Sequence, residues 1–332
     1  MVAFDEKFVS SPLGNLPLSG LPSVLFASAL QGLKRLGLNY IAIPAYSLKY
    51  LSNPASLAGL YLGTKESAEV RFRGGRSFVL KRQGFKSDLW ILVKIARGGV
   101  PLFPSRDLGR VSLAYRGRKA TVEGPGALGL SFQLFFNNEY GPLDPKGAEA
   151  VDVGANIGDT AVFLALSGAA RVLAYEPYRF SYEFAKRNVE QNGLSGIVEL
   201  HRAAVGAASG HIVVESAEGT TISKQATMAG QGEKIPVVGL SGIAGRLRGK
   251  NALLKLDCEG AEYAILLGAP DSALGKFGKI VMEYHYGYVN IKKRLEAAGF
   301  KVTLFGTPRY YYDPAWKNPH VRIGMLMAER KG

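Results

Sequence analysis

The segment Val151–Thr160 constrains the fold of this chain more than any other ten residues. A short apolar run over 150–153 predicts a buried parallel strand, and a helical pattern begins at Asp159. Gly154 and Gly158 lie between them, and glycines at such a turn let the backbone approach a ligand closely. A strand, a glycine turn and a helix in this order predict one βαβ unit of a ligand-binding sheet, with a purely structural turn as the alternative.

A carboxylate follows the next predicted strand at a spacing typical of such units. The strand over 170–175 leads into Glu176, 24 positions after Asp152, and a carboxylate about 20 residues past the glycines usually binds the two hydroxyls of a ribose. The dinucleotide motif places a helix N-terminus against an anionic pyrophosphate, but here Asp152 and Asp159 flank the turn. Two carboxylates repel a pyrophosphate and suit an ammonium and a sulfonium group. The turn therefore predicts S-adenosylmethionine rather than NAD.

Strands and helices alternate after residue 147, which predicts a mostly parallel, doubly wound α/β sheet. The predicted strands are 149–154, 170–175, 197–201, 252–257, 279–285, 300–306 and 320–328, and the predicted helices are 159–167, 179–192, 260–268 and 288–298. Residues 209–239 interrupt this order and predict an antiparallel excursion. Ligands of open sheets bind at the carboxyl ends of the strands, so we expect functional residues just after strand ends.

The N-terminal part mixes helical and strand patterns and predicts a smaller α+β domain. Its predicted elements are a helix over 51–62, hairpins over 70–81 and 111–123, a helix from Asp88 to Arg97, and a helix capped by Ser23 that ends at Leu36. The apolar segment 21–36 is a packed helix or a contact with a membrane surface. Because 141–147 is rich in turn residues, we predict an N-terminal domain over 1–145 that binds the acceptor, and a cofactor-binding domain over 146–332.

Composition limits the setting and the partners. One cysteine, Cys258, among 332 residues excludes a disulfide framework within the chain and favours a reducing, cytoplasmic setting. No predicted segment reaches the about 20 apolar residues of a membrane span, and the N-terminus lacks the basic region of a signal peptide. The formal net charge is +14, and residues 71–119 hold 13 basic and 2 acidic side chains. Such a block is a solvated surface or a footprint for phosphates.

The basic side chains of this block are candidate phosphate contacts of an RNA substrate. They are Arg71, Arg73, Arg76, Lys81, Arg82, Lys86, Arg116, Arg118 and Lys119. Aromatic rings on which bases could stack lie among them, at Phe72, Phe78, Phe85 and Tyr115. Alternatively, these rings form the core of the hairpins.

Six segments of the second half resemble one known family. They are Val151–Asp159, Ala174–Pro177, Asn188–Gly193, Ala203–Gly206, Lys255–Glu262 and Glu283–His285. In order and spacing they resemble the FkbM-type S-adenosylmethionine-dependent methyltransferases over roughly residues 139 to 290, and the motif Lys-x-Asp-x-Glu-Gly-Ala-Glu is the most specific. The first 138 residues carry much less of the resemblance. It implies a class I methyltransferase fold, Rossmann-like and mostly parallel, and O-methylation of sugar or natural-product hydroxyls.

The resemblance also implies a cofactor site. The methionine and ribose end of S-adenosylmethionine would be lined by Asp152, Gly154, Asn156 and Gly158, with Asp159 and Pro177 beside them. Glu176 would accept hydrogen bonds from the ribose hydroxyls. Ala203 would lie by the adenine ring, where a small side chain leaves room for a flat base.

Candidate catalytic residues follow the fourth and fifth strands. They are Lys255, Asp257 and Glu259 after one strand, and Glu283 and His285 after the next. Side chains alternate along a strand, and neighbouring strands lie about 5 Å apart, so these groups could share one pocket. A hydroxyl nucleophile needs a general base or a metal at neutral pH. Asp257, Glu259, Glu283 and His285 could also bind Mg²⁺ or Mn²⁺, but the sequence does not require it and no metal is predicted.

Each candidate also has a plainer interpretation. Lys255 could be an internal salt-bridge partner, Glu259 could favour the start of the next helix, and His285 could be structural. Cys258 is expected to be a small core residue. Trp316 ends an aromatic loop over 310–316 that could cover the acceptor pocket.

Three activities remain open. The first is methyl transfer to a hydroxyl of a sugar, lipid-linked sugar or natural product, with an acidic or histidine base. The second is an RNA methyltransferase whose basic block 71–119 holds the phosphate backbone. The third is a non-catalytic cofactor-binding module, which would leave the acids at the strand ends without a purpose.

Overall fold

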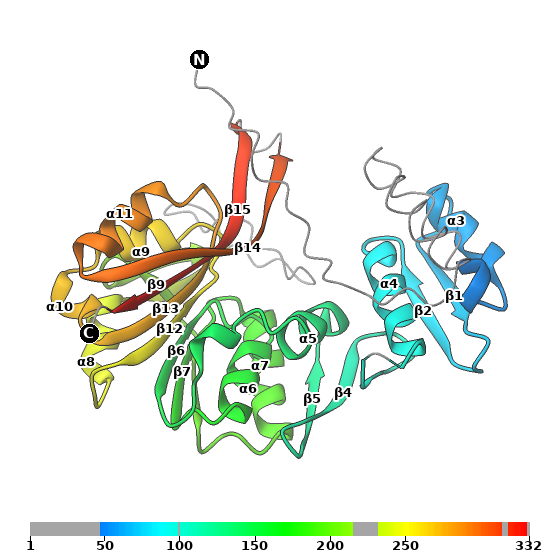
Figure 1. Ribbon diagram of the computed structural model, residues 1–332, viewed down its shortest axis with the longest axis horizontal. Coiled ribbons are helices and arrows are strands. Elements are labelled where there is room, and N and C mark those ends of the chain that lie inside the picture. The colour runs from blue at the N-terminus through cyan, green and yellow to red at the C-terminus, as the bar shows by residue number, and fades with distance from the viewer. Residues whose placement is uncertain (1–46, 99, 215–231, 314–317, 331–332) are drawn as a thin grey trace, which may run out of the picture.

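A seven-stranded sheet forms the centre of the second half of the chain (Figure 1). The structure is a computed structural model that describes residues 47–98, 100–214, 232–313 and 318–330. The strands are β6 (Glu149–Val153), β7 (Arg171–Tyr175), β8 (Val198–His201), β12 (Ala252–Leu256), β13 (Phe277–Tyr284), β14 (Phe300–Asp313) and β15 (Asn318–Arg330). All seven coincide with predicted strands to within a few residues, except that β14 is longer.

The order of the strands is β14-β15-β13-β12-β6-β7-β8. Neighbours from β13 to β8 pair in parallel, whereas β15 pairs antiparallel with both β13 and β14. The first strand of the unit, β6, lies in the middle, and the chain reverses direction across the sheet between β6 and β12. This is the class I methyltransferase fold, with the predicted parallel, doubly wound core, and its ligand site is expected at the carboxyl ends of β6 and β12.

Helices cover both faces of the sheet. They are α6 (Asp159–Leu166), α7 (Arg179–Gln191), α8 (Leu240–Arg246), α9 (Glu262–Gly268), α10 (Asp271–Leu274) and α11 (Val289–Ala297). Successive strand residues point to opposite faces: Ala150 and Leu253 join the hydrophobic cluster that contains α6, while Val151 and Leu254 join the cluster that contains α9. The strands are apolar on both faces because both faces are buried.

The predicted excursion between β8 and β12 is confirmed for the residues that the structure describes. Its strands are β9 (Ala204–Gly206), β10 (Gly210–Val214) and β11 (Glu233–Gly239). β10 pairs antiparallel with β11, as expected, and β11 also pairs in parallel with β9.

The described N-terminal residues form two small sheets and two longer helices. The elements are η1 (Pro54–Leu57), α3 (Ala58–Tyr61), β1 (Ser67–Arg71), β2 (Ser77–Lys81), α4 (Phe85–Ala96), β3 (Leu102–Pro104), β4 (Arg110–Tyr115), β5 (Arg118–Glu123), α5 (Ala127–Phe135) and η2 (Gly141–Leu143). Both predicted hairpins, β1–β2 and β4–β5, are confirmed by their antiparallel registers. The predicted helix over 51–62 is a 3₁₀ turn followed by a single α-helical turn.

The structure contradicts two predictions for chain segments, and a third segment lies outside the described residues. The prediction that Asp88 caps a helix is wrong: α4 begins at Phe85, after Gly84 in the left-handed conformation, so Asp88 lies inside the first turn. The predicted loop over 310–316 is wrong for 310–313, which continue β14 against β15. The predicted segment 21–36 lies outside the described residues. Within the described part of the chain, no helix is long and apolar enough to cross a membrane.

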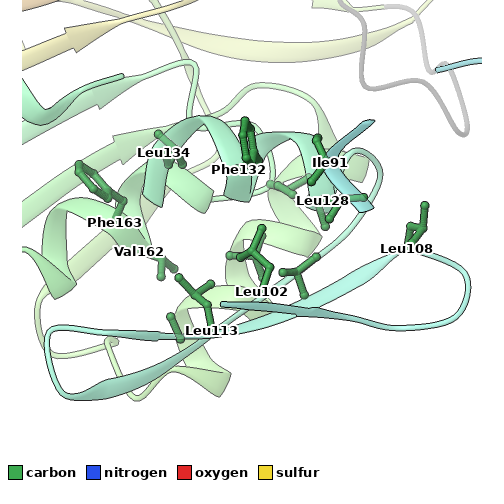
Figure 2. Packing of buried hydrophobic residues seen from close by; sticks show 14 of the residues in the cluster. Ile91, Leu102, Leu108, Leu113, Leu128, Phe132, Leu134, Val162 and Phe163 are labelled. Atoms are coloured by element: carbon green, nitrogen blue, oxygen red, sulfur yellow. The ribbon is translucent and has the colours of Figure 1, made fainter. Parts of the chain in front are cut away.

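The hydrophobic core continues across the predicted boundary at residue 145. Figure 2 shows Leu102, Leu113 and Phe132, from the N-terminal half, packed with Val162 and Phe163 of α6, and all belong to one buried cluster. The separation into domains over 1–145 and 146–332 stays a prediction, but the elements from β3 to α5 share their core with the large sheet.

Asn188 on α7 joins these two parts of the chain. Its side chain is fully buried; Oδ1 accepts the N–H of Glu123, and Nδ2 donates to the carbonyls of Glu123 and Ile157. Ile157 belongs to the glycine turn after β6, so one amide links the turn, α7 and the end of β5.

We expect Asn188→Ala to lower the free energy of unfolding by about 3 kcal/mol, because it leaves buried backbone groups without partners. Urea unfolding followed by circular dichroism measures the change. Asn290→Ala, on the exposed side of α11, is the control and is expected to change little. An equal, small effect of both substitutions would contradict the linking role of Asn188.

Candidate active site

The turn between β6 and α6 is left-handed at three positions, Gly154 (φ 77°), Asn156 (φ 48°) and Gly158 (φ 80°). A Cβ on Gly154 would lie 1.9 Å from the carbonyl oxygen of Asp257, and one on Gly158 would lie 2.8 Å from Cα of Ala185. The neighbouring backbone therefore lies too close to allow a side chain at either position, even without a ligand. Their expected role beside a ligand stays a prediction.

Glu176 receives two backbone hydrogen bonds at the end of β7. Its Oε2 accepts the N–H of Asn156 at 2.9 Å, and its Oε1 accepts the N–H of Tyr178 at 2.9 Å. The side chain is buried, and burial raises the pKa of Glu176 to about 7 although these bonds favour the charged form. Each carboxylate oxygen can accept a further hydrogen bond, which leaves capacity for two hydroxyl donors.

Asp152 and Lys255 form a buried ion pair between β6 and β12. Lys255 Nζ lies 3.0 Å from Asp152 Oδ1 and donates to the carbonyl of Gly154 at 2.7 Å. Burial raises the pKa of Asp152, and Lys255 offsets part of the rise. Burial lowers the pKa of Lys255, but the charges of Asp152 and Asp257 outweigh it and raise the pKa above its ordinary value. Among the described residues, no group hydrogen-bonds Asp152 Oδ2.

The other predicted cofactor residues surround this turn. Asp159 opens α6 and is buried, which raises its pKa to about 7. Pro177 is half-buried, directly after Glu176. Ala203, between β8 and β9, is buried in the hydrophobic cluster that also contains Tyr175.

The register of the sheet places the predicted catalytic side chains on one face. Lys255 pairs with Asp152 on one side and with Val281 on the other. Because side chains alternate, Asp257, Glu283 and His285 then extend from the same face as Lys255. Unlike these three residues, Lys255 forms an ion pair with Asp152.

Asp257, Glu283 and His285 lie together at the ends of β12 and β13, with one ligand atom from each within 4.8 Å of the others. Nε2 of His285 lies 3.4 Å from a carboxylate oxygen of Glu259 and 3.8 Å from one of Glu283. Glu259 has a left-handed backbone (φ 54°), and its side chain is 55% exposed. The structure thus brings these four side chains together, and their catalytic role stays a prediction.

Sequence reasoning missed two residues of this cluster. Glu262 is fully buried; it accepts the N–H groups of Cys258 and Gly260, and its Oε1 lies 3.3 Å from His285 Nδ1. Glu262 is the last residue of the Lys-x-Asp-x-Glu-Gly-Ala-Glu motif, and that position was the sequence feature that could have revealed it. The hydroxyl of Tyr140 donates to Asp257 Oδ2 at 3.1 Å, and no local pattern could reveal a contact across 117 positions.

The surrounding carboxylates determine the charge of His285. Burial lowers the pKa of His285, but the contact with Glu262 and the charges of Asp257 and Glu259 raise it to about 9. The imidazole of His285 is therefore protonated at neutral pH. Cys258, expected in the core, is half-buried, and burial raises its pKa well above the ordinary value.

Most of the predicted phosphate contacts are exposed, and several of them also have partners within the protein. Arg71 and Arg82 form ion pairs with Glu69 and Glu66, and a guanidinium nitrogen of Arg116 donates to the carbonyl of Ser167. These three arginine side chains remain exposed, as do those of Arg73, Arg76, Lys81, Arg118 and Lys119, whereas Lys86 is half-buried. The hairpin β1–β2 lies at the end of the molecule opposite to β12 and β13 (Figure 1), so its basic side chains do not line the cluster.

The aromatic rings of this block mostly belong to the core. Phe72, Phe78 and Phe85 are buried, and Tyr115 packs edge-on against Phe135. The expectation that bases stack on these rings is therefore wrong for the three phenylalanines. The alternative, that they form the hairpin core, is confirmed for Phe72 and Phe78, whereas Phe85 is a buried residue of α4. Phe103, outside the predicted set, is 54% exposed, and the Arg76 guanidinium lies 5.9 Å from its ring centre.

Comparison with known proteins agrees with this architecture. Residues 152–302 match the model of the methyltransferase FkbM domain. The chain is 25% identical over 214 residues to Methyltransferase 1 of Beauveria bassiana, covering 56% of this chain and 82% of that protein. It is 30% identical over 128 residues to the protein-L-isoaspartate O-methyltransferase of Aeropyrum pernix, covering 36% and 46%. A match to a solved rRNA methylase of Streptococcus thermophilus covers 60% of this chain and 96% of that one, at 10% identity and a TM-score of 0.37.

The sheet order and the glycine turn define a class I methyltransferase. Residues 152–302 form a domain that is similar to the FkbM-type methyltransferases, and the protein is an S-adenosylmethionine-dependent methyltransferase.

Proposed function

We propose that the protein transfers a methyl group to a hydroxyl of a sugar, a lipid-linked sugar or a natural product. The observation that supports this best is the cluster of Asp257, Glu259, Glu283 and His285 beside the β6 turn. Asp257 itself touches the turn: its N–H donates to the carbonyl of Val153. Carboxylates at this place suit the removal of a proton from a hydroxyl acceptor.

The residues of the turn fit S-adenosylmethionine. Asp152 Oδ2 is buried without a hydrogen-bond donor among the described residues, and an ammonium group would satisfy it. Glu176 retains acceptor capacity for two ribose hydroxyls. Asp159 would add negative charge near the sulfonium, and Ala203 and Pro177 are small or flat enough to lie beside the adenine.

The bound cofactor would supply an activated methyl group. A C–O bond to the acceptor would form as the S–CH₃ bond breaks, giving a methyl ether and S-adenosylhomocysteine. The chain's own residues position the acceptor and take its proton. We assign the proton to Glu259, because its exposed carboxylate can pass the proton on to water. Asp257 and Glu283, held by Tyr140 and by the strand end of β13, would orient the hydroxyl. Lys255 would act on the cofactor side, by holding Asp152.

Two measurements test this function in sequence. Isothermal titration of the full chain with S-adenosylmethionine is expected to show one site, and the absence of binding would contradict the proposal. Label transfer from the cofactor is then measured with pools of glycans, lipid-linked sugars and total RNA. Label in a hydroxyl of the first two pools, lost in Glu259→Gln, is the expected result.

We expect Glu176→Gln to weaken cofactor binding at least about 10-fold, a loss of roughly 1.4 kcal/mol. The amide would present N–H groups where the carboxylate accepts hydrogen bonds from Asn156 or Tyr178 and from ribose. Glu190→Gln, on the exposed side of α7, is the matched control. An unchanged dissociation constant in Glu176→Gln would remove Glu176 from the cofactor site.

RNA remains the second candidate acceptor, and the exposed groups on and near β2 and β3 favour it. Arg76, Arg106 and Phe103 line a cavity of about 280 Å³, and a guanidinium beside an exposed ring suits a stacked base and its phosphate. This surface lies far from the cluster (Figure 1), so only an extended acceptor could contact both. Binding to total RNA that falls steeply with salt and is weakened by Arg76→Ala would support RNA. Salt-independent, weak binding would exclude it.

The cytoplasmic setting is part of this proposal and rests on the single cysteine. Contact of segment 21–36 with a membrane surface, and the acceptor-binding role of residues 1–145, stay predictions.

A further inference from the structure

The cluster at the ends of β12 and β13 has an excess of negative charge. Four carboxylates, those of Asp257, Glu259, Glu262 and Glu283, face one imidazole. The nearby ammonium of Lys255 is held by Asp152, 3.0 Å away. Buried charge of one sign is costly unless a counter-charge is bound, so the gathered carboxylates favour a bound cation.

His285 is oriented in the way metal-binding histidines are. Its Nδ1 faces the buried carboxylate of Glu262 at 3.3 Å, while Nε2 faces Glu283 and Glu259. Glu262 is itself fixed by the N–H groups of Cys258 and Gly260. A carboxylate behind one ring nitrogen, with the other nitrogen turned toward further ligands, orients a histidine and raises its basicity as a ligand.

Asp257 is supported in a similar way. Tyr140 donates to its Oδ2, and the Tyr140 side chain is buried. The other oxygen, with the carboxylate of Glu283 and an imidazole nitrogen of His285, completes a set of three ligand atoms within 4.8 Å of one another. Small side-chain shifts would bring all three to the roughly 2.0–2.2 Å of a metal–ligand bond.

We propose that Asp257, Glu283 and His285 bind one divalent transition-metal ion of the Mn²⁺ or Zn²⁺ type. The imidazole is a ligand that Zn²⁺ favours and the carboxylates are ligands that Mn²⁺ favours, whereas an imidazole is a poor ligand for Mg²⁺. Three protein ligands leave coordination positions open for water or an acceptor. The sequence predicted no metal, so this site goes beyond what the sequence indicated.

The role of the ion rests on the proposed function. A hydroxyl bound to the metal has a lowered pKa, so it can lose its proton to Glu259 before its oxygen attacks the methyl carbon. The ion is neither oxidised nor reduced, and the products remain a methyl ether, S-adenosylhomocysteine and a proton.

Direct metal titration tests the site independently of any acceptor. The full chain, stripped with a chelator, is titrated with Mn²⁺ and followed by calorimetry and by electron paramagnetic resonance of the free ion. We expect one bound Mn²⁺, and at least about 10-fold weaker binding in Asp257→Asn, Glu283→Gln and, through His285, Glu262→Gln. Glu329→Gln, whose carboxylate pairs with Lys279 at the other end of β13, should bind as the wild type does.

Either of two results would overturn the metal site: no Mn²⁺ binding at millimolar concentration, or equal binding by wild type and the isosteric variants Asp257→Asn and Glu283→Gln. Circular dichroism establishes that each variant is folded, and Asp257→Asn retains an acceptor for Tyr140. S-adenosylmethionine is titrated separately into the metal-free chain. Failure of that titration would count against the proposed function, whereas failure of the Mn²⁺ titration alone would count only against the metal.

Discussion

Lys255→Met is expected to lower the free energy of unfolding by about 3–5 kcal/mol, the cost of leaving a buried charge without its partner. Lys255 is 2% exposed and Asp152 is fully buried, and methionine keeps the length of the side chain without its charge. Urea unfolding measures the change. A loss below about 1 kcal/mol would show that the pair is solvated like a surface salt bridge.

The pH dependence of this stability loss, together with a double substitution, distinguishes the effect of the unpaired charge from a packing defect. Burial raises the pKa of Asp152, and losing Lys255 raises it further. A raised carboxyl pKa means that the folded state binds the proton more tightly, so stability falls as pH rises above the unfolded value of about 4. The loss in Lys255→Met should therefore be larger at about pH 8 than at about pH 5. The double variant Asp152→Asn/Lys255→Met is expected to recover most of the lost stability. If the loss came from a packing defect, the double variant would not recover it.

Gly154→Ala is expected to destabilise the protein by about 3 kcal/mol or more, and to abolish cofactor binding. The new Cβ would lie 1.9 Å from the carbonyl oxygen of Asp257, so the backbone of β6 or β12 must move, and overpacking costs about 1–3 kcal/mol. The left-handed conformation, φ 77°, adds about 1 kcal/mol. Urea unfolding and calorimetric titration with S-adenosylmethionine measure the two effects.

Gly193→Ala provides the matched control. Gly193 also has a left-handed backbone, φ 67°, but a Cβ added there would have no other atom within 4 Å beyond its chain neighbours. Its substitution should cost only the conformational term, about 1 kcal/mol. If both variants lose the same stability, the contact between the β6 turn and Asp257 is not what requires glycine at position 154.

Much of the cofactor half could be predicted because its signals are local. The apolar run of β6, the glycines after it and Glu176 after β7 lie within 27 residues, and each reflects a period or a turn preference of the chain itself. The positions of Asp257 and His285 at strand ends followed from the same patterns. The N-terminal half was predicted less well: α5 was missed, and α4 begins at Phe85 rather than after Asp88.

The contacts inside the site depend on the order of the strands. Lys255 and Asp152 are 103 positions apart, and they pair because β12 lies beside β6. Tyr140 reaches Asp257 only because the chain brings η2 into contact with β13. A local pattern contains no information about which strand lies beside which.

The amino-acid sequence alone was thus enough to predict the class of sheet, the cofactor turn and the catalytic candidates, since periodicity and turn residues act within a few positions. The tertiary structure decided which contacts the candidate residues make. It turned Lys255 toward Asp152, placed Glu262 behind His285, and buried the phenylalanines of the basic block. The reason is physical: strand order and register bring together side chains that are distant in the chain, and burial then determines their charge.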